Sequence, residues 1–242
     1  MAATESSPAL LPDLGAPTPI GLLLAPDRTM ERHAKVGRAL WIFLFAWLCS
    51  IMLGTVLAYR VDARSSTLRK LDQGGQLATM SDRQVADETR NAERMSQVGS
   101  IAKGVVGVPL DLGGACLATL ALAWFLRGRI KGAAVAPVAA ASLLPGALAK
   151  LLDAFAAFRH AVIPPDGIDL SPRSLTAFLA LFGHPLNGPW IKLGSALDLF
   201  SFWSALILGF GVAAVGQLSR KSALAATMVA WVCYQLLTRV AT

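Results

Sequence analysis

The sequence predicts an all-α membrane protein, a bundle of five transmembrane helices with one further helix outside the membrane before the second span. Two observations carry this prediction. First, 55% of the 242 residues are hydrophobic and only 15% are charged, whereas a soluble domain carries about 25% charged residues. Second, the chain contains five long apolar stretches, and a helix needs about 20 such residues to cross the hydrocarbon layer. The stretches are 39–59, 101–126, 133–158, 195–218 and 222–240.

Each apolar stretch is expected to be helical, because backbone N–H and C=O groups in lipid must be paired within the protein. The segment before them, residues 1–27, contains five prolines and lacks the basic start of a signal peptide. We therefore expect residues 1–27 to be a disordered leader. Residues 28–242 then form one membrane domain.

The short turns between stretches predict the orientation. The turn after the second stretch carries Arg127, Arg129 and Lys131, and the turn after the fourth carries Arg220 and Lys221, with no acid in either. Basic residues in short loops favour the cytoplasmic side. We expect a cytoplasmic N-terminus and an outer C-terminus, in the inner membrane if the chain is bacterial.

The loop 60–100 is then expected outside, with seven basic and six acidic residues. Ser81 followed by Gln84 has the form of a capping box, in which the two side chains satisfy backbone N–H groups at a helix start. This pattern predicts a polar helix that begins near Asp82 and continues into the second span.

The second long loop, 160–194, contains a short apolar pattern in residues 171–182. The spacing predicts an amphipathic helix that lies along the outer interface or caps the bundle. The residues expected on its apolar face are Leu175, Phe178, Leu179 and Phe182.

Ionisable residues interrupt the apolar stretches at four positions. A charge at mid-span costs about 3 kcal/mol, so such residues are rarely accidental. From the helical rise, all four are expected roughly 9–13 Å inside the outer ends of their helices. Two interpretations stay open: a polar clasp in which the lysine pairs with an acid and fixes helix packing, or a proton or cation site. The four residues are Asp111, Lys150, Asp153 and Asp198.

Several function classes lack their sequence signatures. No zinc-protease motif, no serine-hydrolase elbow and no glycine-rich phosphate loop occurs, so no catalytic, cofactor or metal site is expected. The basic residues do not form one patch, which argues against a nucleic-acid partner. The expected partners are the lipid bilayer and other membrane proteins or further copies of the chain.

The fourth stretch and the turn after it carry a specific pattern of residues, namely Asp198, Phe200, Trp203, Gly209, Gly211, Arg220 and Lys221. The pattern resembles the last hairpin of the Yip domain family, in its bacterial type, and Gly107 followed by Pro109 is similar to the second span of that family. The resemblance implies five spans with a cytosolic N-terminus.

Together these features predict a non-enzymatic integral membrane protein of Yip type that acts as a scaffold or binds partners. The family-like hairpin and the absence of catalytic motifs favour this function. The alternative is an ion or small-solute transporter, or an accessory subunit of one, that uses the acidic layer inside the membrane.

Overall fold

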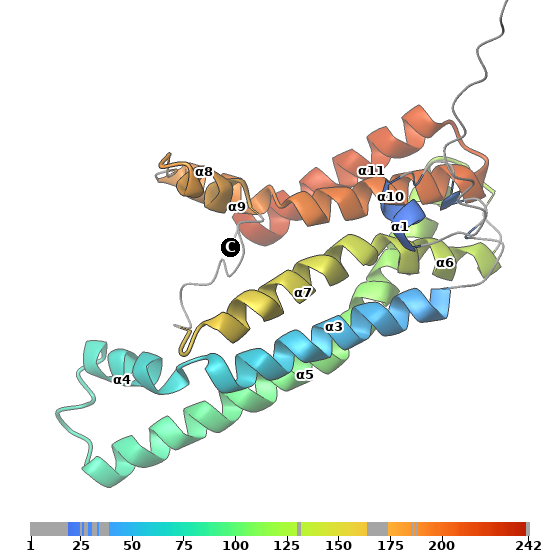
Figure 1. Cartoon of the computed structure of the whole chain (residues 1–242). Coiled ribbons are helices and arrows are strands. Elements are labelled where there is room, and N and C mark those ends of the chain that lie inside the picture. The colour runs from blue at the N-terminus through green and yellow to red at the C-terminus, as the bar shows by residue number, and fades with distance from the viewer. Residues whose placement is uncertain are drawn as a thin grey trace, which may run out of the picture.

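The computed structural model describes residues 19–240, except for residues 25, 27–28, 31–32, 34–38, 130–131, 164–173, 185 and 187. Within these residues the chain is helical and has no β-strand, which confirms the predicted all-α class. Two isolated β-bridges connect loops near the helix ends. The helices form an elongated bundle (Figure 1).

Helix α3 (Ala39–Arg60) and helix α5 (Asp82–Phe125) run antiparallel, side by side (Figure 1). Helix α5 begins with the predicted capping box at Ser81 and continues without a break into the second apolar stretch, which confirms the prediction. At 1.5 Å per residue α5 is about 66 Å long, roughly twice the hydrocarbon thickness. Its polar first half therefore extends beyond the apolar region, where the unpredicted helix α4 (Ala63–Gln73) packs along it.

The backbones of α3 and α5 approach closely at two glycines. A Cβ atom added to Gly54 would lie 2.6 Å from the carbonyl oxygen of Ser100, and one added to Gly104 would lie 2.8 Å from that of Ser50. In lipid, helices associate through close van der Waals packing, and small residues make this approach possible.

The third apolar stretch forms two helices, α6 (Gly132–Ser142) and α7 (Leu144–Arg159). The break follows from Pro145 in the first turn of α7, because proline has no N–H to donate to the preceding turn. The alanine-rich α6 is largely buried, and Val138 is fully enclosed.

The fourth stretch also differs from its prediction. Helix α10 spans Leu199–Gly216, and the residues before it form a separate short helix, α9 (Pro189–Ala196). The predicted amphipathic helix is α8 (Leu175–Leu181), while residues 171–173 lie outside the described residues. The fifth stretch contains α11 (Arg220–Gln235) and a π-helical turn, η1 (Leu236–Val240).

Among the described residues, four helical segments are long and apolar enough to cross a membrane, which supports the membrane class. The 16 residues of α11 measure about 24 Å, less than the hydrocarbon thickness of about 30 Å. The count of five spans therefore stays a prediction. The four segments are Ala39–Arg60, Asp82–Phe125, Gly132–Arg159 (α6 with α7) and Leu199–Gly216.

Different helix ends and turns meet at the two ends of the bundle. The start of α3, the end of α5 and the α10–α11 turn gather at one end, on the right in Figure 1. At the other end, the N–H of Asp62 donates to the carbonyl of Ile163 at 3.0 Å, and the N–H of Ile163 donates to that of Arg60 at 2.8 Å. These bonds tie the end of α3 to the end of α7.

A short helix, α1 (Pro19–Leu24), lies inside the segment predicted to be a leader. Its Leu22 is fully buried in a core cluster that also contains Val138 and Ile207. Residues 1–18 lie outside the described residues, so the domain boundary at residue 27 stays a prediction.

Candidate functional site

An ion pair joins two of the helical segments that are long and apolar enough to cross a membrane. The Nζ atom of Lys150 on α7 lies 3.2 Å from Oδ2 of Asp111 on α5. Asp111 is ten residues after Ile101, or about 15 Å along the helix, which places it near the middle of the apolar part of α5. The side chain of Asp111 is 56% exposed and that of Lys150 is 27% exposed. The pair therefore lies at the surface of the bundle.

The exposure of Asp111 has an energetic consequence. A charged side chain in hydrocarbon is costly, and such residues normally face the interior of a bundle or pair with one another. Lys150 neutralises part of the charge, but about half of the Asp111 side chain remains uncovered by the chain. The carboxylate oxygens can accept hydrogen bonds from a further segment placed against α5.

The face of α5 around Asp111 is open. Of the most apolar part of α5, 11% is buried within the chain, compared with 61% for α6 and α7 together. A Cβ atom added to Gly114, three residues after Asp111, would meet nothing within 4 Å. Residues three and four apart share a helix face. Small residues follow this spacing on both sides of Asp111, namely Gly107, Gly114, Ala118 and Ala121.

The other two predicted acids have different surroundings. Asp153 lies three residues after Lys150 on α7, and it is buried. Asp198 precedes α10, and its Oδ1 accepts from the backbone N–H groups of Phe200 at 2.8 Å and Ser201 at 3.3 Å. The expected position of Asp198 well inside a helix is therefore wrong, because this aspartate caps the helix instead of continuing it.

The remaining residues of the family-like pattern lie mainly at helix contacts. A Cβ atom on Gly209 would lie 3.0 Å from Leu224 of α11, while one on Gly211 would overlap Val138 of α6. The two glycines thus let α10 approach neighbours on different sides. Phe200 and Trp203 are half-buried, and Arg220 and Lys221 are exposed at the start of α11.

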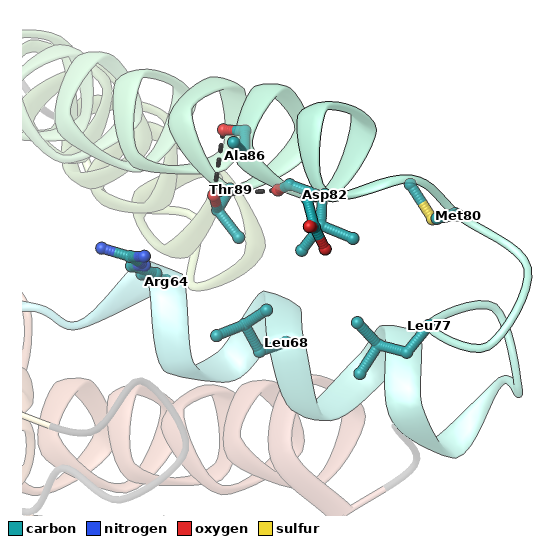
Figure 2. Close-up of a pocket in the computed structure, with 8 residues that line it drawn as sticks. Arg64, Leu68, Leu77, Met80, Asp82, Ala86 and Thr89 are labelled. Carbon is teal, nitrogen blue, oxygen red and sulfur yellow. Dashed lines mark hydrogen bonds between the residues drawn. The ribbon is translucent and has the colours of Figure 1, made fainter.

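A separate cavity of about 220 Å³ lies between α4 and the polar half of α5. Figure 2 shows side chains from both helices around it, with the hydroxyl of Thr89 directed at the carbonyls of its own helix. Sequence reasoning missed this cavity because α4 was not predicted. The described residues contain no group of three or more metal-ligating side chains. The cavity is lined by Arg64, Leu68, Leu77, Met80, Asp82, Val85, Ala86 and Thr89.

A family model described as Yip1 domain matches residues 20–239, which is nearly the whole chain. No curated protein and no solved structure matches it. The matched region contains all four ionisable residues of the predicted layer.

Proposed function

Because the chain belongs to the Yip1 domain family, which is generally non-enzymatic, we propose that it is an integral membrane scaffold that binds a partner membrane protein. The observation that carries the proposal is the half-exposed side chain of Asp111, with its carboxylate, on the open face of α5. The predicted occupant of this face is a transmembrane helix of the partner.

The chemistry of the open face of α5 predicts which side chains the partner helix carries. A segment that covers Asp111 removes its carboxylate from contact with acyl chains, and interhelical hydrogen bonds in membranes contribute about 1 kcal/mol. The small residues beside Asp111 leave room for a close backbone approach, as Gly114 has nothing opposite it. The matching helix carries a hydroxyl, amide or basic side chain at the depth of Asp111.

Electrostatics favour a different protein over a second copy of the chain. A two-fold dimer uses the same surface on both subunits. Such a dimer centred on Asp111 would place two carboxylates opposite each other in a medium of low dielectric constant, where like charges repel strongly. A partner with a donor at this position avoids that repulsion.

The proposal includes the predicted topology of five spans, with the N-terminus in the cytoplasm and the C-terminus outside. The two basic turns lie at the same end of the bundle, as this topology requires. Maleimide labelling tests it in a background where Cys49, Cys116 and Cys233 are replaced by alanine. In that background, Asp72→Cys in the outer loop and Gln217→Cys in the inner turn should react from opposite sides of the membrane. Labelling of both from one side would contradict it.

The partner proposal is tested by site-specific photocrosslinking in native membranes. A photoreactive residue at Leu117, which is 69% exposed on the open face of α5, is expected to form an adduct with a membrane protein. The control position is Val229 on α11, which is 64% exposed. We expect the Leu117 adduct to depend on a hydrogen-bond acceptor in the side chain of residue 111 and any Val229 adduct to be indifferent to it.

Matched variants separate the charge from the fold. Asp111→Leu combined with Lys150→Leu removes both charges without leaving an unpaired cation, and it should lower the yield of the Leu117 adduct about fivefold. Asp111→Asn keeps an acceptor and should retain most of the adduct. Adducts with lipid alone, or a yield unchanged by the double substitution, would overturn the proposal. An adduct with a second copy of the chain would mean that this face mediates self-association instead of binding a different protein.

A further inference from the structure

Helix α5 ends in a turn that places an arginine in a backbone conformation usually occupied by glycine. The N–H of Gly128 donates to the carbonyl of Ala123 at 2.8 Å, and the N–H of Arg127 donates to that of Trp124 at 3.1 Å. These two bonds define a Schellman motif, whose left-handed residue is most often glycine. Here that residue is Arg127, with a φ of 56°.

Helix α10 ends in a similar way. The N–H of Leu218 donates to the carbonyl of Ala213 at 3.2 Å, and Gln217 occupies the left-handed position with a φ of 53°. The left-handed region is unfavourable for a residue with a Cβ atom. Two helix ends at the same end of the bundle therefore carry long polar side chains where glycine would fit more easily.

The two turns contact each other. The N–H of Arg129 donates to the carbonyl of Gly216 at 3.3 Å. A Cβ atom added to Gly128 would lie 2.9 Å from the side chain of Leu218, so this glycine permits the contact. Tertiary structure thus unites two turns that are almost 90 residues apart in the sequence.

The two turns that contact each other are strongly basic. Arg127 and Arg129 come from the first turn, Arg220 and Lys221 from the second, and all four are exposed. Neither turn contains an acidic residue. Trp124, one residue before the end of α5, is also exposed. Tryptophan favours the boundary between acyl chains and headgroups, so these cations lie at the depth of lipid phosphates.

We propose that these paired basic turns bind the anionic headgroup of a phospholipid. Arginine forms paired hydrogen bonds with phosphate oxygens, and the two turns supply three guanidinium groups and one ammonium group. Charge complementarity selects anionic over zwitterionic lipids, since each Lys or Arg near a membrane surface strengthens binding to anionic lipid. This site lies apart from the open face of α5 and does not depend on the proposed partner.

The site is tested on the purified full chain in detergent, with a fluorescent phosphatidylglycerol as the anionic probe and a fluorescent phosphatidylcholine as the neutral one. The anionic probe is expected to bind more tightly, and its affinity should fall as salt is added. Arg129→Gln combined with Lys221→Gln should lower the affinity about 25-fold, or about fivefold for each charge. Arg90→Gln combined with Arg94→Gln removes two exposed charges from the polar half of α5 and should leave the affinity unchanged.

A second pair of variants separates charge from backbone strain. Arg127→Gly and Gln217→Gly place the preferred residue at the two left-handed positions, so both should fold and neither should lower the melting temperature. We expect Arg127→Gly alone to lose about fivefold in affinity for the anionic probe. Equal loss in Gln217→Gly, equal loss in the Arg90 and Arg94 control, or equal binding of phosphatidylcholine would overturn the proposal. Equally tight binding of soluble glycerol phosphate would exclude a lipid-specific site.

Discussion

The indole Nε1–H of Trp47 donates a hydrogen bond of 2.6 Å to the backbone carbonyl oxygen of Val105, which joins α3 to α5. In a regular helix this carbonyl would accept from the N–H of residue 109, four positions later. Residue 109 is proline, which has no N–H. Trp47 therefore satisfies the acceptor that Pro109 leaves free, in a region where water is scarce.

Trp47→Phe is expected to destabilise the protein by about 1 kcal/mol, because it leaves the Val105 carbonyl without a donor. In the background of Pro109→Ala the restored N–H of residue 109 can bond this carbonyl, so Trp47→Phe should cost less there. Unfolding of the four proteins in detergent gives the coupling energy. Equal losses in both backgrounds would show that the hydrogen bond does not depend on Pro109.

The close crossing of α3 and α5 predicts that added methyl groups there are poorly tolerated. Gly54→Ala and Gly104→Ala should each destabilise the protein by about 1–3 kcal/mol, since their new Cβ atoms would meet backbone oxygens. The control is Gly99→Ala on α5, where a Cβ atom meets nothing within 4 Å. That change should be neutral or stabilising by about 0.5–1 kcal/mol, because alanine favours helix over glycine. If thermal unfolding in detergent shows that Gly99→Ala is as destabilising as the other two substitutions, the close approach of α3 and α5 at the two glycines is contradicted.

Capping by Asp198 predicts a distinct response to two substitutions. Asp198→Asn should be nearly neutral in stability, because asparagine caps helices as well as aspartate does. Asp198→Ala should destabilise the protein by about 1 kcal/mol and increase amide exchange at Phe200 and Ser201, whose N–H groups lose their acceptor. If the two variants lose stability equally, the role of Asp198 depends on its charge and not on the cap.

The surroundings of Asp62, at the start of α4, predict that the stability of this helix depends on pH. Hydrogen bonds from the hydroxyl and then the N–H of Ser65 hold the pKa of Asp62 below its ordinary value of 3.8. A lowered folded pKa means that this stabilisation of α4 is present above pH 3.8 and is lost as the pH falls through the folded pKa. NMR titration of the carboxyl carbon should give a midpoint below 3.8, and a midpoint above it would contradict the cap. In Asp62→Asn, the amide protection of Ser65 should no longer follow this titration.

Much of the fold follows from local chemistry. The apolar stretches predict helices because lipid offers no other partner for the backbone, and the capping box at Ser81 locates the start of α5 to the residue. The last hairpin, from Asp198 to Lys221, resembled the family that the match over residues 20–239 confirms. These features depend on residues a few positions apart, so they can be read along the chain.

Other features depended on residues that only folding brings together. The ion pair of Lys150 with Asp111, one of three acids open to it from the sequence, required the packing of α7 against α5. The bond from Trp47 to Val105 and the contact of the two basic turns likewise join positions distant in sequence. Hydrophobic pattern determines which segments are helices, but helix packing depends on where side chains are small enough for backbones to meet. Tertiary structure therefore decided which polar groups share a surface. In this way it also decided where the proposed partner and lipid sites lie.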